Sequence, residues 1–214
     1  MARKKQTEKP AKNRDILILK AIDIFSEKGF KGTTIREVSR AAGVNAPTLY
    51  YYFGNKEGLW LEILTFLAED LMQELRKATN EKDALKRFNK LLETHIRMSQ
   101  KNRKVSNIFS IDEGHLTPDG LKIFKGIHRR VVELYVEELS SLEKMGYIKG
   151  LNINALAFNT LALINWQVRW FKPEGPMSLE DLIRETTSFV LYGILGSGYE
   201  KETKKSNKEG KGGS

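Results

Sequence analysis

Apolar residues recur three or four positions apart along most of the chain, which is the period of an α-helix with one buried face. The pattern first predicts a helix from Asn13, a capping residue, to Gly29, which suits the left-handed position after a helix end. The same period continues over residues 55–77, 83–100, 118–145, 153–171 and 178–196, with a shorter helix over 103–112. No segment alternates with the period of a strand.

Two further short helices lie between residues 35 and 54, and local signals mark their ends. Thr34 and Glu37 form an S/T-x-x-E capping box, which predicts a helix over 35–42 before a glycine turn. The next helix is expected over 45–54, with Pro47 in its first turn, where a missing N–H has no helical partner to lose. Later helices have similar start signals at Asn55, at Thr117 with Pro118, and at Ser178 with Asp181. We therefore predict an all-α protein of about nine helices.

The short pair over 35–42 and 45–54, joined by Gly43 and Val44, has the spacing of a helix-turn-helix. The residues expected to pack its inside are Ile35, Val38, Ala41, Val44 and Leu49, together with Phe25 of the first helix. The outer side of its second helix would then carry Asn45, Ala46, Pro47, Thr48, Tyr50 and Tyr51. Consecutive helical residues point about 100° apart, so three tyrosines in a row cannot all face a core. A glycine-turned pair without any DNA contact is the alternative.

A recognition helix meets base edges with its N-terminal residues, which predicts Asn45, Ala46 and Thr48 as readers. Tyrosine hydroxyls and Lys56, at the start of the next helix, are suited to phosphate contacts that hold the register without reading sequence. Thr33 and Thr34 stand at another helix N-terminus and could act in the same way.

The stretch "TTIREVSRAAGVNAPTLYYYFGNKEGLW" resembles the N-terminal domain of the TetR family of bacterial transcriptional repressors. The shared features are the threonine-capped helix, the "AAGV" turn, the "LYYYF" helix and the "NKEGL" start of the fourth helix, within residues 12–62. The resemblance implies a homodimer on a palindromic double-stranded DNA operator, with an effector-binding C-terminal bundle. It carries DNA contact over to Thr34, Asn45, Ala46, Pro47, Thr48, Tyr50, Tyr51 and Lys56, although Pro47 stands where other members often have a small or polar reader.

The charge distribution suggests where domains begin and end. The net charge is +9, and the first 14 residues hold six basic groups against one acid, whereas the tail from Glu200 holds five lysines against three acids. We therefore expect a disordered basic arm over 1–12, which could touch phosphates, and a disordered tail over 199–214. Between them we expect a DNA-binding domain over 13–60 and an effector-binding and dimerisation domain over 61–198. No apolar run is long enough to cross a membrane and no secretory signal precedes the basic arm, so a cytoplasmic location is expected.

The last two predicted helices are the expected dimer interface. "INALAFNTLALINWQVRWF" has apolar residues on more than one side, so one face can pack inward while another meets a second copy. Thr186, Ser188 and Gly193 are small enough for close approach of the two chains. In the TetR family the last two helices form such an interface. The alternative is that this helix is a central core helix.

Aromatic and polar residues on the predicted fifth to eighth helices could line an effector pocket with apolar walls and a few polar groups. These are Phe88, His95, Met98, Phe109, Phe124, His128, Tyr135, Asn165, Trp166 and Trp170, each of which could instead be an ordinary core residue. "NWQVRWFKPEGPMSLEDL" resembles the same segment in TetR-type regulators of fatty-acid and steroid-side-chain breakdown, which respond to acyl-CoA thioesters. The expected small hydrophobic effector is therefore an acyl-CoA or, alternatively, an aromatic or cationic drug-like compound.

Catalytic chemistry has little support in the sequence. There is no cysteine, no "GxSxG" and no glycine loop for phosphate, and the three histidines share no i, i+4 spacing. We expect no enzyme activity, no cofactor and no metal site. A non-specific architectural DNA-binding protein remains the rival from a different class, since the chain is basic.

Overall fold

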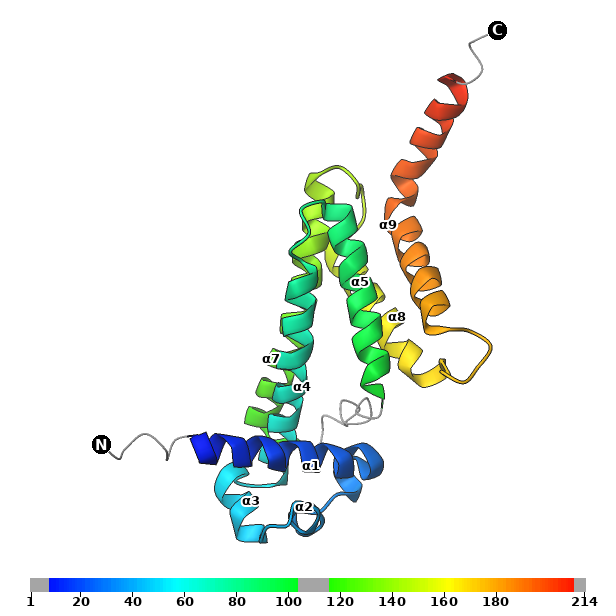
Figure 1. Cartoon of the computed structure of the whole chain (residues 1–214). Helices are drawn as coiled ribbons and strands as arrows, with labels where there is room; N and C mark the ends of the chain where they lie inside the picture. The colour runs from blue at the N-terminus through cyan, green and yellow to red at the C-terminus, as the bar shows by residue number, and fades with distance from the viewer. Residues whose placement is uncertain (1–7, 104–115, 210–214) are drawn as a thin grey trace, which may run out of the picture. The chain divides into compact units, whose positions relative to one another are not determined.

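The computed structural model describes the backbone of residues 8–103 and 116–209, and the side chains of residues 14–103 and 116–195. The described residues form helices joined by turns, with no strand among them, so the all-α prediction is confirmed. The helices are α1 Glu8–Gly32, α2 Ile35–Ala41, α3 Ala46–Phe53, α4 Lys56–Ala78, α5 Ala84–Lys101, α7 Pro118–Lys144, α8 Ile153–Trp170 and α9 Leu179–Glu209 (Figure 1). The short helix predicted over 103–112 lies almost wholly outside the described residues, as does Phe109.

The predicted starts of α2 and α4 are confirmed by the hydrogen bonds of their caps. At α2 the Thr34 hydroxyl accepts from the Glu37 N–H at 3.2 Å, while the Glu37 carboxylate accepts from the Thr34 N–H at 2.9 Å. The Asn55 side chain accepts from the Gly58 N–H at 2.8 Å, at the start of α4. Each contact satisfies an N–H group that has no partner within its own helix.

Two predicted boundaries are wrong. The first helix begins at Glu8 rather than Asn13, because Pro10 falls in its first turn, where its missing N–H is tolerated. The last helix continues to Glu209 rather than ending near Gly196, because a glycine lowers helix stability by only about 1 kcal/mol and the residues beyond it are mostly good helix formers. Gly29 was predicted correctly as a break: it lies at φ +68°, where α1 kinks.

The chain forms two compact units, each with its own core. The first contains residues 1–70 and 102–128, and the second contains residues 71–101 and 129–214. In the first unit α2 packs against both α1 and α3, and Trp60 of α4 is fully buried. Its apolar core comprises Leu17, Ile18, Ala21, Phe25, Ile35, Val38, Leu49, Phe53, Leu59, Trp60, Leu61, Ile63, Leu64, Ala68, Phe124 and Ile127. Residues 118–128 of α7 therefore share a core with the predicted helix-turn-helix.

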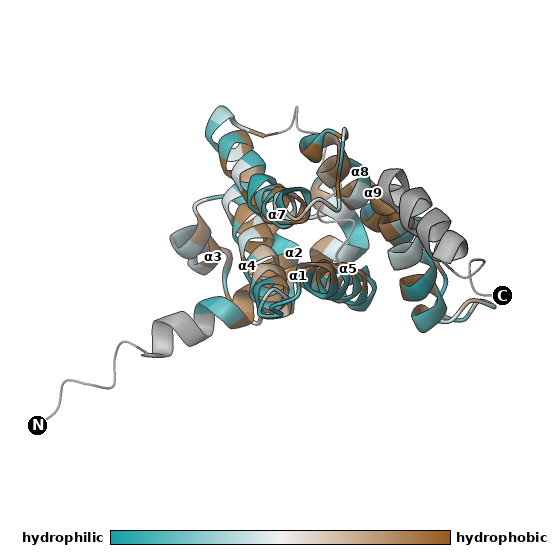
Figure 2. Cartoon of the chain, turned by 90° about the horizontal axis from the view of Figure 1, so that it is seen from above, coloured by the Kyte–Doolittle hydropathy of each residue, from teal (hydrophilic) through white to brown (hydrophobic). Residues whose placement is uncertain are grey.

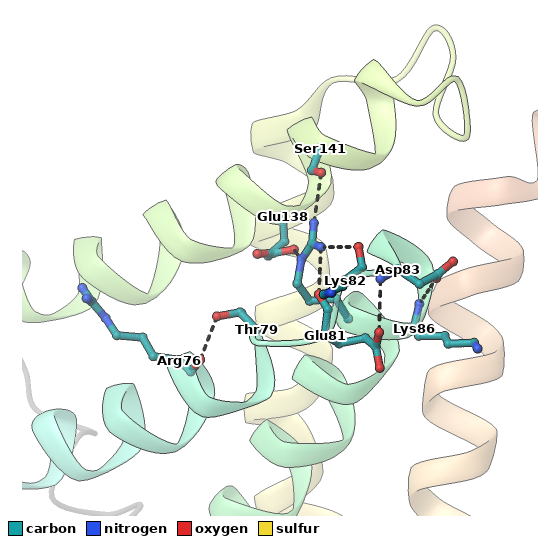
Figure 3. Close-up of polar contacts among 9 residues, drawn as sticks. Arg76, Thr79, Glu81, Lys82, Asp83, Lys86, Glu138 and Ser141 are labelled. Carbon is teal, nitrogen blue, oxygen red and sulfur yellow. Dashed lines mark hydrogen bonds and ion pairs between the residues drawn. The ribbon is translucent and has the colours of Figure 1, made fainter.

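In the second unit α5 packs against α8 and α9, and α7 contributes Tyr135 and Leu139 to the core. Polar contacts hold the turn between α4 and α5 against α7 (Figure 3). Arg87 donates to Glu138 at 2.6 Å, to Ser141 at 3.1 Å, and to two carbonyls of the turn. Both members of the Arg87–Glu138 pair are largely buried, so the additional bonds supply the donors and acceptors that a desolvated ion pair needs.

Candidate nucleic-acid interface

The turn between α2 and α3 reverses the chain within a few residues. Gly43 lies at φ +67°, a conformation that residues with a Cβ rarely adopt. The Val44 N–H then donates to the Ser39 carbonyl at 3.0 Å, which closes the turn. Asn45 caps α3, because its side-chain oxygen accepts from the Thr48 N–H at 3.0 Å and from the Thr48 hydroxyl at 2.5 Å.

The inner side of this helix pair agrees with the prediction except at one position. Ile35, Val38 and Leu49 are buried in the core of the first unit, and Val44 is half-buried. Ala41 is exposed, contrary to the prediction, because α2 ends there and the chain turns away from the core. Ser39 is buried in addition, and its hydroxyl donates to the Arg36 carbonyl at 2.9 Å. A serine can occupy a core position when the preceding turn supplies an acceptor.

The residues predicted as base readers lie at the N-terminus of α3. Asn45 and Pro47 are exposed, whereas Ala46 and Thr48 are half-buried. Because the Asn45 oxygen is occupied by the cap, its NH₂ group is the part that can donate to a base edge. Pro47 presents an apolar ring without an N–H.

The three tyrosines divide as helical geometry requires. Tyr50 is 52% exposed and Tyr51 is 84% exposed, whereas Tyr52 is half-buried. The rings of Tyr51 and Tyr52 meet edge to face with centroids 5.3 Å apart, and Tyr52 packs in turn on Phe53 at 6.0 Å. An exposed phenol ring supported by a neighbouring ring is well placed for contact with a partner.

The two threonines before α2 differ in exposure. Thr33 is only 1% exposed, and its hydroxyl donates to the Gly29 carbonyl at 2.7 Å. This removes Thr33 from the surface, because its hydroxyl completes the kinked end of α1 instead. Thr34 is exposed and caps α2, where the hydrogen bond from Lys28 and those from Thr34 lower the pKa of Glu37 to about 2.

Lys56 is half-buried at the start of α4, and its ammonium group already has partners. Its Nζ donates to the Phe30 carbonyl at 2.9 Å and lies 4.4 Å from the centroid of the Phe30 ring. An ammonium has three N–H donors, so this arrangement fixes the head of the side chain and leaves donors for an anion.

Two arginines on the outer side of α2 were missed. Arg36 and Arg40 are both exposed, four residues apart and therefore on one side of the helix. Lys31 is also exposed, in the last turn of α1. The signal for Arg36 and Arg40 was in the sequence: basic residues at i and i+4, offset from the apolar positions of a helix that precedes a recognition helix.

The residues predicted to line an effector pocket fall into separate places. Phe88, His95 and Tyr135 come together in the core of the second unit. Ring centroids are 6.2 Å apart for Phe88 and Tyr135, while His95 Nδ1 lies 2.9 Å from the Tyr135 hydroxyl. Met98 is half-buried further along α5. Burial lowers the pKa of His95 to about 4 and raises the pKa of Tyr135.

The other pocket candidates lie elsewhere. Phe124 is buried in the first unit, stacked on Trp60 with centroids 5.7 Å apart, and its ring meets the exposed His128 at 4.5 Å. Asn165, Trp166 and Trp170 are exposed on α8. The helical period could not separate these locations, because it gives the face of a helix but not the element that packs against it.

Two buried glutamines were missed as polar groups of the second unit. Both amide atoms of Gln100 are buried without a hydrogen-bond partner among the described residues, as is the side-chain oxygen of Gln167. The NH₂ group of Gln167 donates to the Thr186 hydroxyl at 2.6 Å. The sequence held a signal for Gln100, because it continues the buried stripe of α5 four residues after Ile96.

The last two helices carry large exposed apolar side chains. They are Phe158, Trp166 and Trp170 on α8, and Phe189 and Tyr192 on α9. Hydrophobic segments recur along α8 in Figure 2. Gly193 is exposed, as predicted for a close approach, and Ser188 is half-buried. Thr186 is buried between α8 and α9 instead, because Gln167 needs its hydroxyl as an acceptor.

Among the described residues, no group of three His, Asp or Glu side chains could hold a metal ion. None of the described helices is long and apolar enough to cross a membrane.

Two models of known protein families match this chain. The family model described as "Bacterial regulatory proteins, tetR family" matches residues 17–63. A second, described as "Tetracyclin repressor-like, C-terminal domain", matches residues 81–194. The first match contains the helix-turn-helix, and the second alone covers more than half of the chain.

Individual relatives are similar over most of their length. The HTH-type transcriptional repressor KstR2 of Mycolicibacterium smegmatis is 28% identical over 201 residues, which are 90% of this chain and 95% of the relative. The solved structure of AibR in complex with isovaleryl coenzyme A and operator DNA matches with a TM-score of 0.73 and 19% identity, over 86% of this chain and 98% of that one. The structure of the fatty acid degradation regulator FadR from Bacillus halodurans also matches with a TM-score of 0.73. It is 18% identical, and the match covers 84% of this chain and 98% of that one.

The buried imidazole predicts a pH dependence of stability. In the folded chain the pKa of His95 is lowered from 6.5 to about 4. Between pH 4 and 6.5 this imidazole is therefore protonated in the unfolded chain but neutral in the folded chain. Stability is therefore full above about pH 6.5 and is lost as the pH falls toward 4, by about 3 kcal/mol in the free energy of unfolding. Denaturant unfolding at a series of pH values measures this loss. His95→Gln keeps a polar partner for Tyr135 without titrating in this range, so it should remove most of the pH dependence of stability. A His95 imidazole that titrates near pH 6.5 by NMR in the folded protein would contradict this prediction.

Proposed function

The chain belongs to the TetR family of bacterial regulatory proteins, and on that premise we propose that it is a transcriptional repressor. It binds a palindromic operator as a homodimer and releases the operator when a small hydrophobic effector, an acyl-CoA, binds. The observation that carries this proposal is the exposed N-terminal side of α3, with Asn45, Pro47, Tyr50 and Tyr51 on a short helix whose opposite side is buried.

DNA recognition follows from the chemistry of that surface. Asn45, Ala46, Pro47 and Thr48 enter the major groove, where an amide N–H can donate to a base and the apolar groups can meet a thymine methyl. Phosphate contacts come from the exposed side chains of Thr34, Arg36, Arg40, Tyr50 and Tyr51, and from the half-buried Lys56. Hydroxyl and cationic groups of this kind fix register and orientation without reading sequence.

The homodimer follows from the size of one DNA-binding unit. One α3 helix reads a single half-site, so two copies must present their helices about 34–36 Å apart to enter successive major grooves on one face of DNA. The exposed aromatic residues of α8 and α9 supply an apolar face for this association, with exposed small residues such as Ala162 and Gly193 permitting close contact. Large apolar side chains of this kind are costly to leave in water.

The effector site is proposed for the core of the second unit. A buried amide atom without a hydrogen bond costs about 1–3 kcal/mol, so the atoms of Gln100 and Gln167 that have no partner among the described residues favour a ligand with polar groups inside an otherwise apolar core. His95 and Tyr135 add a buried polar pair near aromatic Phe88. The relative AibR, in complex with isovaleryl coenzyme A, supports an acyl-CoA by analogy. A drug-like aromatic or cationic compound is the alternative effector.

Release is proposed as a shift between two populations of the repressor. An effector that binds one state more tightly draws the protein into that state, with a coupling of about 1–3 kcal/mol in similar systems. In that state α4 moves and the two DNA-binding units no longer match the groove spacing.

The DNA-binding proposal predicts the effect of Tyr51 on operator affinity. An operator selected from random DNA should bind at least about a thousandfold tighter than non-specific DNA at physiological salt. Tyr51→Ala should weaken operator binding about tenfold through loss of a phosphate contact and its ring, and Tyr51→Phe should weaken it less. Fluorescence anisotropy measures both. Tyr147→Ala, at an exposed tyrosine of the second unit, is the control. Equal affinity for all DNA would instead support the architectural alternative.

The dimer proposal predicts that a charge on α9 separates the subunits. Phe189 is 71% exposed, so Phe189→Lys should leave each subunit folded. Burial of an unpaired ammonium in an interface is strongly unfavourable, and the dimer should dissociate at least about a hundredfold more readily. Sedimentation velocity measures the change. Met145→Lys, at another exposed apolar residue that belongs to neither α8 nor α9, should leave the dimer intact. A wild-type chain that sediments as a monomer would refute the proposal.

The effector proposal predicts that an acyl-CoA weakens operator binding. Titration with acyl-CoAs from isovaleryl-CoA to long-chain thioesters should reveal at least one that lowers operator affinity about fivefold or more. Free coenzyme A is the control for the nucleotide part. Gln100→Leu should reduce this response while preserving operator binding in the absence of thioester. A flat response to the whole series would leave the drug-like alternative.

A further inference from the structure

Two residues from different parts of the chain cap the start of α7. Thr117 is its N-cap, and the Thr117 hydroxyl accepts from the Gly120 N–H at 3.1 Å in the usual way. The Thr117 N–H and hydroxyl in turn donate to one carboxylate oxygen of Glu57, on α4, at 3.0 Å and 2.8 Å. Glu57 precedes Thr117 by 60 residues and belongs to the same compact unit.

The capping box of α2 shows what this contact replaces. In α2 both halves come from one helix, because the Glu37 side chain at the third position accepts from the backbone of the Thr34 cap. In α7 the third position is Gly120, which has no side chain to reach back. A Cβ at Gly120 would lie 1.8 Å from the Glu57 oxygen that receives both Thr117 bonds. The Glu57 carboxylate therefore lies where a side chain at position 120 would begin.

We infer that Glu57 completes the capping box that α7 lacks in its own sequence, and that this makes Glu57 a positioning residue for the DNA-binding helix. A carboxylate at this place also meets the positive end of the α7 dipole. Gly120 is the complementary requirement, since any side chain there would displace Glu57.

The link reaches the recognition helix through tight packing. Glu57 is in the first turn of α4, separated from the end of α3 only by Gly54 and Asn55. A Cβ at Gly58 would lie 2.1 Å from the Phe53 carbonyl, so α3 and α4 meet without room for adjustment. A second contact supports the first, because Trp60 of α4 stacks on Phe124 of α7. The direction of α3 therefore depends on where α7 begins.

This inference rests on the proposed DNA binding, and a pair of variants separates positioning from simple capping. Glu57→Ala removes the shared cap, so the Tm should fall by about 2–4 °C. Operator affinity should fall about fivefold or more relative to random DNA. Glu57→Ala combined with Gly120→Glu restores a capping box within α7 but leaves α4 untied. This double variant should recover the Tm but not the operator affinity.

Two controls lie in the same unit. Glu27→Ala removes one exposed acid from α1 and corrects for the change in net charge on DNA binding. Gly126→Ala adds a Cβ to α7 where no atom lies within 4 Å, so it should leave operator affinity unchanged, whereas Gly120→Ala should reproduce the loss seen with Glu57→Ala.

Recovery of operator affinity in the double variant would overturn the positioning role, as would unchanged affinity in Glu57→Ala. Hydrogen exchange in the free protein separates these outcomes from a failure of the proposed function. The amides of α3 and of the first turns of α4 should exchange faster in both Glu57 variants, even if the wild-type protein selected no operator. Unchanged exchange there would also refute the inference.

Discussion

The structure depends on the packing of a helix too short to be stable by itself. α3 spans eight residues, and isolated helices below about 12–15 residues are marginal in water. Its stability must come from Leu49 and Phe53, which are buried in the core of the first unit. Because one side of α3 is committed to the core, the side with Asn45, Pro47 and Tyr51 is fixed in direction and exposed. The packing that stabilises α3 therefore also decides which of its residues form the candidate DNA surface.

The same constraint explains the tight junctions around α3. Gly43 permits the reversal before it, and Gly58 permits the close approach of α4 after it. Trp60 of α4 packs between two further aromatic rings, with its centroid 5.6 Å from that of Phe30 and 5.7 Å from that of Phe124. A helix packed this tightly on its neighbours can be repositioned only by moving those neighbours, which suits a protein proposed to respond to an effector.

The second unit has a different character, since its core contains polar groups at several places. The Arg87–Glu138 pair is supplied with partners, whereas Gln100 and Gln167 retain atoms without a hydrogen bond in the described part of the chain. A core designed only for stability would use apolar residues at such positions. The contrast between a satisfied ion pair and unsatisfied amides is what favours ligand binding in this unit.

The sequence alone determined the helices and most of their ends, because caps and apolar periods are local: Thr34 with Glu37, Asn55 and Thr117 all cap as predicted. It also indicated the exposed tyrosines, since consecutive helical residues cannot share one side. Only the tertiary structure decided which elements meet. It buried Thr33, exposed Ala41, moved Phe124 into the core of the first unit and brought Glu57 to Gly120. The positions of Phe124 and Glu57 depend on contacts between residues tens of positions apart, which neither a helical period nor a cap can encode.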